Sequence, residues 1–175
     1  MSGVLPTRLP IDLGPLPYGA TMVTRDEGVV RVAPQTIFNI VRDVSRWPEW
    51  LPHYRWVRFL ETDGQGGGVV EMAANRPFGP FGWPTWWRSD MHVEGTKRSV
   101  RFRHIGGITT GMDVEWTFEP HTEGTHVRLL HVWNGPPWPL IGTLAANVVI
   151  GPVFVHGIAS RTLAGLGRVA EGMSR

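Results

Sequence analysis

Two histidines, His104 and His131, are the side chains in this sequence best suited to chemistry near neutral pH. His104 alternates with Val100 and Phe102 in VRFRHI, and His131 alternates with Leu129 in THVRLLHVW. Because residues two apart point to the same side of a strand, the pattern predicts both imidazoles on the apolar, inner face of a sheet. There they could orient a carbonyl or hydroxyl group of a ligand, or act as candidate general acid and base. The alternative is that each imidazole makes a hydrogen bond within an ordinary core.

Other familiar reaction centres are missing from the sequence. There are no cysteines, which excludes disulfides, thiolate metal sites and cysteine nucleophiles. The seven histidines form no His-x-His or His-x-x-x-His pair, so we expect no metal site and no cofactor. The Gly-x-Ser-x-Gly motif of acyl transfer is absent. The run GQGGG at residues 64–68 lies between two predicted strands, where it indicates a hairpin turn and not a phosphate-binding loop.

The composition indicates one globular domain that does not bind nucleic acid. Arginine and lysine together number 17 against 15 acidic residues, a formal net charge of +2, and no long basic run occurs. An apolar fraction of 42% and 175 residues suffice for a single domain with a large core. Residues 1–19 are rich in proline and glycine, so we expect an irregular arm there, either wrapped around the domain or loose. This segment has no secretory pattern, and the expected location is cytoplasmic.

The apolar periodicity divides the rest of the chain into strands and helices. A strand-like stretch at residues 20–32 is followed by apolar residues at helical spacing, which predict a helix from Pro34 to about Ser45. A short helical turn is expected at residues 48–51. Residues 55–133 alternate with period two in six stretches separated by turn residues, which predicts an antiparallel meander. The chain then becomes helical to its end, so the fold class is α+β.

The C-terminal helical region has two interpretations. No charged residue occurs from Leu129 to Ser160, and residues 140–159 are long enough to span a bilayer. Beyond them, apolar residues share one helical face and charged residues the opposite face, which favours a helix packed on the sheet. We predict a helix buried by its own domain, with a break at Gly151-Pro152 because proline removes a backbone donor.

The segment VRVAPQTIFNIVRDVSRWPEWLPHYRWVRFLE, residues 30–61, resembles the opening of the START-like (SRPBCC) superfamily. In that group a strand ends at Ala-Pro, a helix follows, and a Trp-Pro turn leads into the second strand. The segment is most similar to the polyketide cyclase/dehydrase branch, which also holds coenzyme Q-binding-like proteins. The resemblance implies a helix-grip fold over residues 20–175. This fold is a curved seven-stranded antiparallel sheet around a long C-terminal helix, with two short helices between strands 1 and 2 and a cavity between sheet and helix.

The strand pattern gives an inventory for the wall of that cavity. Alternate residues of the predicted strands should face it and bind the ligand: Trp87, Ser89, Met91, His104, Met112, Trp116, His131 and Trp133. Trp86 and Arg88 have the opposite parity and should face outwards. The aromatase/cyclases of the superfamily carry Trp-x-Ser-Glu-Arg, whose arginine polarises a polyketide carbonyl. Here Met91 takes the place of that arginine, which favours holding a flat or long apolar molecule over cyclising it.

Three functions follow as hypotheses. The first is binding or carriage of a hydrophobic small molecule in the cavity, such as a lipid, an isoprenoid quinone or a polyketide-like compound. The alternative is a polyketide cyclase/dehydrase enzyme of the aromatase/cyclase type with a pocket histidine as acid/base, and the third is an interaction module. The connection RPFGPFGWP, too long and proline-rich for a tight hairpin, predicts an entrance loop with Phe78, Phe81 and Trp83. That loop leaves peripheral membrane contact open. The sequence predicts neither the ligand nor the oligomeric state.

Overall fold

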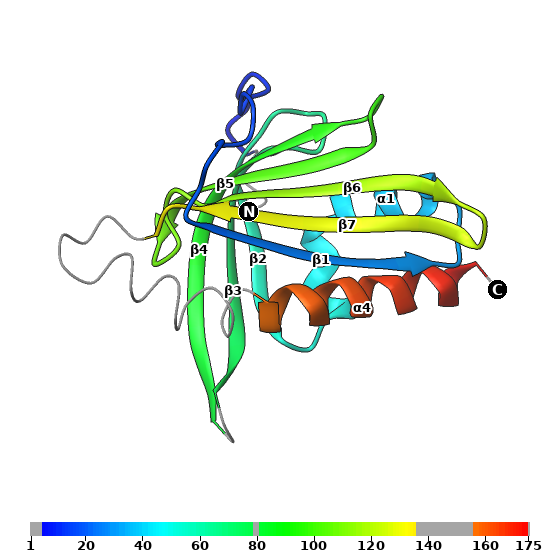
Figure 1. Ribbon diagram of the computed structural model, residues 1–175. Helices are drawn as coiled ribbons and strands as arrows, with labels where there is room; N and C mark the ends of the chain where they lie inside the picture. Colours follow the sequence, from blue (N-terminus) through cyan, green and yellow to red (C-terminus); the bar gives the residue numbers. More distant parts are fainter. Residues whose placement is uncertain (1–4, 79–80, 136–155, 175) are drawn as a thin grey trace.

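The computed structural model describes residues 5–78, 81–135 and 156–174 and has the α+β arrangement expected from the sequence (Figure 1). Seven antiparallel strands form one sheet in the order β1-β7-β6-β5-β4-β3-β2. The strands are β1 (Met22–Val30), β2 (Tyr54–Thr62), β3 (Gly68–Phe78), β4 (Phe81–Glu94), β5 (Ser99–Gly107), β6 (Asp113–His121) and β7 (Gly124–Trp133). The helical elements are α1 (Pro34–Arg42), the 3-10 turn η1 (Val44–Arg46), α2 (Trp47–Trp50) and α4 (His156–Met173). The predicted helix-grip fold is confirmed.

The short helices between β1 and β2 follow the local sequence closely. Pro34 stands in the first turn of α1, where its missing N–H costs nothing, and the apolar face of this helix is buried. Helix α1 ends at Arg42, three residues before the predicted end at Ser45, and Val44–Arg46 form a 3-10 turn instead. Helix α2 includes Trp47 before Pro48, because proline is tolerated in the first turn of a helix.

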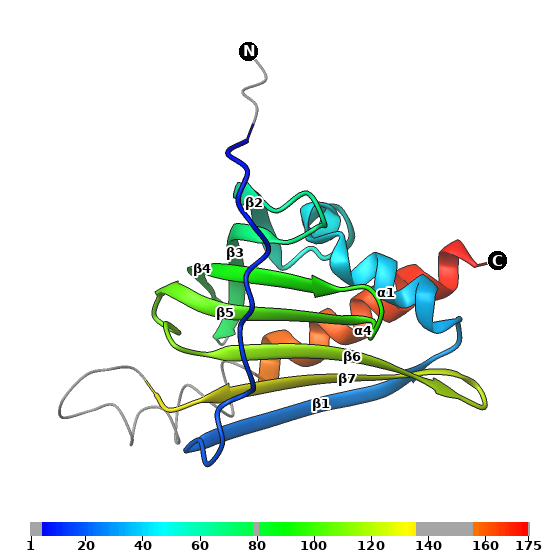
Figure 2. The ribbon, with the colours of Figure 1, turned by 90° about the horizontal axis from the view of Figure 1, so that it is seen from above.

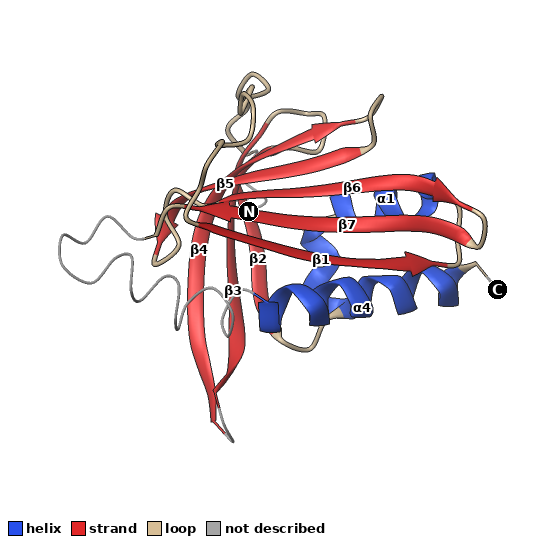
Figure 3. Cartoon of the chain, viewed as in Figure 1, coloured by secondary structure: helices blue, strands red, loops and turns tan. Residues whose placement is uncertain are grey.

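The helices lie on one face of the sheet and the N-terminal arm on the other. Figures 1 and 3 show α4 running alongside β1, whereas β3 and β4 run steeply across that direction, so the sheet curves around the helix. Helix α4 packs against β1, α1 and α2. The core fills the space between them, and its largest fully buried side chains include Trp116, Phe38, Met72, Leu129 and Leu166. The concave face of the sheet is therefore the face that can hold a cavity.

Helix α4 has the two faces that the sequence predicts. Ala159, Leu166 and Ala170 are buried, whereas Arg161 and Arg168 are exposed. The helices of the described residues include none that is long and apolar enough to cross a membrane. The candidate span at residues 140–159 and the expected break at Gly151-Pro152 lie almost wholly outside the described residues.

The connection between β3 and β4 differs from the prediction. No long loop separates the strands, because β3 continues to Phe78 and β4 begins at Phe81, and these two residues face each other across the ladder. Strand β2 pairs with β3 only as far as Ala74, and β5 pairs with β4 only from Trp87 onward. The end of the hairpin is therefore a two-stranded ribbon whose outer edges have no further strand beside them. A proline is tolerated there where its nitrogen points to such an open edge, because no ladder hydrogen bond is lost.

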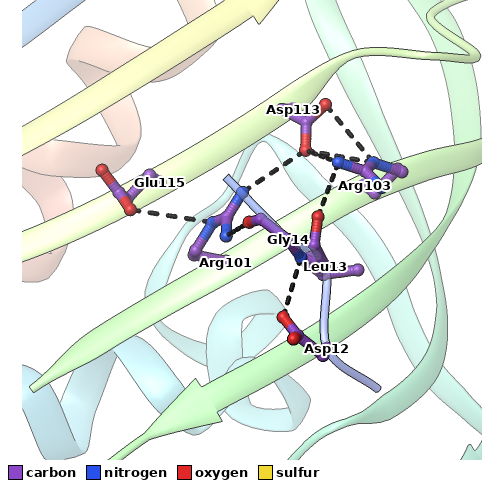
Figure 4. Close-up of polar contacts among 7 residues, drawn as sticks. All are labelled: Asp12, Leu13, Gly14, Arg101, Arg103, Asp113 and Glu115. Atoms are coloured by element: carbon purple, nitrogen blue, oxygen red, sulfur yellow. Dashed lines mark hydrogen bonds and ion pairs between the residues drawn. The ribbon is translucent and has the colours of Figure 1, made fainter. Parts of the chain in front are cut away.

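The N-terminal arm is wrapped around the domain, across the convex face of the sheet (Figure 2). Its first anchor is a parallel bridge between Thr7 and Thr62 at the β2 edge. A second anchor lies over β5 and β6, where Arg103 donates to the carbonyl oxygen of Leu13 at 2.9 Å and Arg101 donates to that of Gly14 (Figure 4). Both arginines also pair with Asp113, at 2.9 Å and 3.6 Å.

Candidate functional site

A cavity of about 70 Å³ lies between the concave face of the sheet and α4. Its wall is mostly aromatic and aliphatic, with two imidazoles and two threonine hydroxyls. The described residues that line it are Trp47, Tyr54, Met72, Trp87, Phe102, His104, Thr109, Met112, Val114, Trp116, Leu129, His131, Ile158, Ala159 and Thr162. They come from α2, from each of the strands β2 to β7, from the turn between β5 and β6, and from the first half of α4.

Five of the eight residues predicted to face the cavity line it. These five are Trp87, His104, Met112, Trp116 and His131. The other three, Ser89, Met91 and Trp133, point to the same side of the sheet and are buried, but they lie outside the lining. Trp133 instead donates its indole N–H to the carbonyl oxygen of Thr110 at 3.0 Å. Their parity was predicted correctly, whereas their distance from the cavity depends on where α4 crosses the sheet.

Several lining residues come from outside the central strands and were not predicted from the sequence. Trp47 lies in α2, Thr109 in the turn between β5 and β6, and Thr162 in α4. Met72 could have been found, because it alternates with buried Val70 along β3. The residues from helices and turns carry no periodic signal that connects them to the sheet.

An aromatic cluster makes one side of the cavity rigid. The Trp47 ring contacts the rings of Tyr54 and Trp116 edge to face, with centroids 5.2 Å and 6.2 Å apart. Such contacts stabilise a fixed arrangement of rings. The side chains of Met72 and Met112 complete the wall and are more adaptable, because unbranched thioether chains have several accessible rotamers.

His104 is held in place from two sides. Its Nδ1 lies 2.7 Å from the hydroxyl oxygen of Thr109, which is itself buried. Its ring is stacked on Trp87, with 6.0 Å between the ring centroids. A buried hydrogen bond and a stacked ring together fix the orientation of an imidazole, so His104 presents a defined edge to the cavity. His131, on β7, lines the same cavity.

A hydrogen bond forms part of the wall between the cavity and the outside. Nε2 of His53 lies 3.0 Å from Oγ1 of Thr162, and the His53 ring packs against Tyr54 with 4.9 Å between centroids. Burial lowers the pKa of His53 below its ordinary value, and the charge of Arg161 lowers this pKa further. The imidazole is therefore neutral at pH 7 and takes part in this bond as an uncharged group.

No arginine is among the described residues of the cavity wall. Arg88, the neighbour of Trp87, points outwards as predicted, and its Nη2 lies 2.6 Å from a carboxylate oxygen of Glu71. Arg58 pairs with the other oxygen of Glu71 at the same distance. Hydrogen bonds from Arg88 and then Arg58 hold the pKa of Glu71 below its ordinary value. Trp86 also faces outwards and is 50% exposed.

The sequence matches a known protein family and one curated relative. Residues 30–153 match the family described as polyketide cyclase / dehydrase and lipid transport. A curated relative, the granaticin polyketide synthase bifunctional cyclase/dehydratase of Streptomyces violaceoruber, is 30% identical over 122 residues. That match covers 67% of this chain and 36% of the relative, so this chain spans about a third of the relative's length.

Solved structures share the fold. The Zhui aromatase/cyclase from a Streptomyces species is 20% identical, with a TM-score of 0.70 over 87% of this chain and 95% of that one. A protein from Thermus thermophilus is 18% identical, with a TM-score of 0.72 over 87% of this chain and 99% of that one. The STAR-related lipid transfer protein from Xanthomonas axonopodis is 15% identical, with a TM-score of 0.54 over 88% and 89%. At these identities the likeness extends to the fold alone.

The family match covers most of the chain, including α1, α2 and the whole meander from β2 to β7. The overall fold agrees with that of the solved structures, at TM-scores of 0.72 and 0.70. This chain is therefore a member of the polyketide cyclase / dehydrase and lipid transport family.

Proposed function

We propose that this protein binds a hydrophobic small molecule in the cavity between the sheet and α4, as a binding or carrier protein. The observation that carries the proposal is the composition of the wall, which combines apolar side chains with a few polar groups at fixed places. Ligand sites generally have this character, because burial of apolar area supplies the affinity and the polar groups set the orientation. His104, His131, Thr109 and Thr162 are polar groups of this wall. Lipids, isoprenoid quinones and polyketide-like compounds are the candidate ligands.

The size of the cavity requires the wall to move when a ligand binds. A cavity of about 70 Å³ is several times smaller than the roughly 300–1,000 Å³ of ligand sites in general. Met72 and Met112 are the side chains best able to make room, since their rotamers change at low cost. The edge-to-face rings of Trp47, Tyr54 and Trp116 would stay in place and act as a template for flat ligands.

Binding of a neutral fluorescent dye would test this proposal. The dye N-phenyl-1-naphthylamine becomes bright in apolar surroundings, and we expect it to bind the wild-type protein. Ala159→Met should weaken binding by about tenfold or more, because Ala159 lines the cavity and the longer side chain would occupy it. The control is Ala33→Met, at an exposed position just before α1 that does not line the cavity. Equal binding by both variants, or no binding by the wild type, would overturn the proposal.

Native mass spectrometry of the purified protein tests the same proposal without an added ligand. An apolar compound of constant mass that stays bound to the wild type and is lost from the Ala159→Met variant supports carriage. A compound retained equally by both proteins contradicts the cavity as its site.

A second candidate function is a cyclase/dehydrase reaction, and one observation favours it. His104 and His131 line the same cavity, where imidazoles could transfer protons to and from a carbonyl or hydroxyl of a polyketone. Replacement of both residues by phenylalanine should abolish turnover of a hydroxy-ketone substrate if this function is correct. Dye binding is expected to persist in that variant, so loss of turnover with intact dye binding separates catalysis from carriage. Turnover that survives the double replacement would exclude these histidines as acid and base.

A further inference from the structure

A second hollow lies on the outside of the wall that contains His53 and Thr162. It runs between α4 and the segment that joins α2 to β2. The described residues that line it are Leu51, His53, Ser160, Arg161, Ala164, Gly165 and Arg168. Ala164 and Gly165 leave room there because they carry a methyl group and no side chain, and the lining includes two arginines, Arg161 and Arg168.

The two arginines are available for an external charge. Arg161 and Arg168 are seven residues apart, so they lie on the same side of α4 about 10 Å from each other along its axis. Both are exposed, and neither forms an ion pair or a hydrogen bond with any residue that the structure describes. No carboxylate is among the described residues of the hollow. An anion in the hollow would therefore lie near the positive charges of Arg161 and Arg168.

A hydrogen-bonded pair of side chains joins the wall of this hollow to the wall of the cavity. Thr162 lines the cavity, His53 lines the hollow, and the two are hydrogen-bonded to each other at 3.0 Å. Tyr54, which also lines the cavity, packs on the His53 ring. A molecule with its apolar part in the cavity could therefore place a polar end in the hollow if the His53 side chain moved aside.

We propose that the hollow is an anion-binding subsite and that the natural ligand is an amphiphile with an acidic group, a carboxylate or a phosphate, held by Arg161 and Arg168 while its apolar part occupies the cavity. This inference rests on the proposed binding function and narrows its ligand class. Guanidinium groups suit both kinds of acid, because their N–H donors match two oxygen atoms at once. In this arrangement the His53 side chain would lie between the apolar part of the ligand, in the cavity, and its acidic group, in the hollow.

The pKa of the His53 imidazole provides a second test, one that does not rely on measuring ligand affinity. The charge of Arg161 contributes to the lowered pKa of His53, after burial. An anion bound to Arg161 would offset that charge, so the pKa of His53 should rise on binding. NMR titration of the imidazole, in the presence and absence of ligand, measures this change.

The experiment compares probes that differ only in the head group. Octanoate, octyl phosphate and neutral 1-octanol are each used to displace N-phenyl-1-naphthylamine from the wild type and from two double variants. The test variant is Arg161→Gln with Arg168→Gln. The control variant is Lys97→Gln with Arg128→Gln, which removes the same charge from residues that form no ion pair or hydrogen bond within the described part of the chain.

We expect the test variant to bind octanoate and octyl phosphate about fivefold to tenfold more weakly than the wild type, as two exposed charge pairs warrant. Its affinity for 1-octanol, and all three affinities of the control variant, should not change. The two anions should also lose affinity in high salt, whereas the alcohol should not. Octanoate alone affected would indicate a carboxylate ligand, and octyl phosphate alone a phosphate ligand.

Two results would overturn the inference. One is equal binding of anions and alcohol by the wild type with no effect of the test variant. The other is an equal loss of anion affinity in both double variants. That result would show that anion binding depends on the net charge of the protein and not on Arg161 and Arg168. Either result leaves dye binding to the cavity intact. If the proposed function itself is wrong, by contrast, neither the dye nor any of the three probes should bind to the wild type.

Discussion

Nδ1 of His104 and the hydroxyl of Thr109 lie 2.7 Å apart, both buried at the wall of the cavity. The two residues belong to the end of β5 and the turn that follows it, so a local turn fixes the orientation of the most central polar group of the site. The backbone supports this turn with bonds in both directions between His104 and the segment Gly111–Met112.

Replacement of Thr109 by valine should therefore destabilise the protein. The change keeps the shape of the side chain but removes the hydroxyl partner of a buried imidazole nitrogen, at a cost of about 1–3 kcal/mol. Urea unfolding measures this loss. Thr96→Val, at an exposed position, is the control and should change stability by less than about 0.5 kcal/mol. A Thr109 variant as stable as the control would show that the bond contributes nothing.

Glu71→Gln should lower stability at pH 7 and flatten its dependence on acid. Glu71 is buried between Arg58 and Arg88, and its folded-state pKa lies below the ordinary value. A lowered pKa contributes stability that is complete above the unfolded-state pKa and is lost as the pH falls through the folded-state pKa. The wild type should lose this contribution below about pH 4.5, whereas the glutamine variant has no such contribution to lose.

Denaturant unfolding at pH 7 and pH 3 measures both effects. Glu123→Gln removes an exposed carboxylate in the turn between β6 and β7 and should leave the difference between the two pH values close to that of the wild type. A Glu71 variant with the same acid dependence as the wild type would contradict the prediction.

Asp113→Asn should release the N-terminal arm. Asp113 is 2% exposed and holds Arg101 and Arg103, which in turn donate to the backbone of Leu13 and Gly14 (Figure 4). Loss of one partner of a mostly buried ion pair costs roughly 3–5 kcal/mol. Hydrogen exchange of the backbone amides around Leu13 and Gly14 should be faster in this variant than in Glu119→Gln, an exposed change on the same strand. Equal rates would mean that the cluster does not hold the arm.

Two glycines of α4 should respond in opposite directions to alanine. A methyl group at Gly165 would overlap with Cδ2 of buried Leu51, whereas a methyl group at Gly172 meets no neighbouring atom. Alanine in an open helical position stabilises by about 0.5–1 kcal/mol, so Gly172→Ala should raise the melting temperature. Gly165→Ala should lower it, because the clash exceeds the gain in helix propensity. A rise in both variants would show that Leu51 yields without cost.

The period-two pattern predicted which side chains face inwards, but it did not predict the extent of the ladder. Trp87 and Arg88 lie on opposite faces of β4 because successive residues of any strand do so. The hairpin at Phe78 and Phe81 was misjudged as a loop because its prolines forbid pairing only where a neighbouring strand is present. The lengths of β2 and β5 depend on the packing of the whole sheet, so no local sequence pattern predicts them.

The sequence alone determined the order of the elements, the inner and outer faces of the strands and the family. These are local properties, since propensity, alternation and the motif from Val30 to Glu61 are all read within short windows. The tertiary structure decided which inward residues reach the cavity. Met91 and Trp133 are packed away from it, whereas Trp47 and Thr162 line it, because the depth of each residue depends on where α2 and α4 cross the curved sheet. It also brought His53 to Thr162, 109 residues further along the chain, a contact that depends on the packing of α4 against α2.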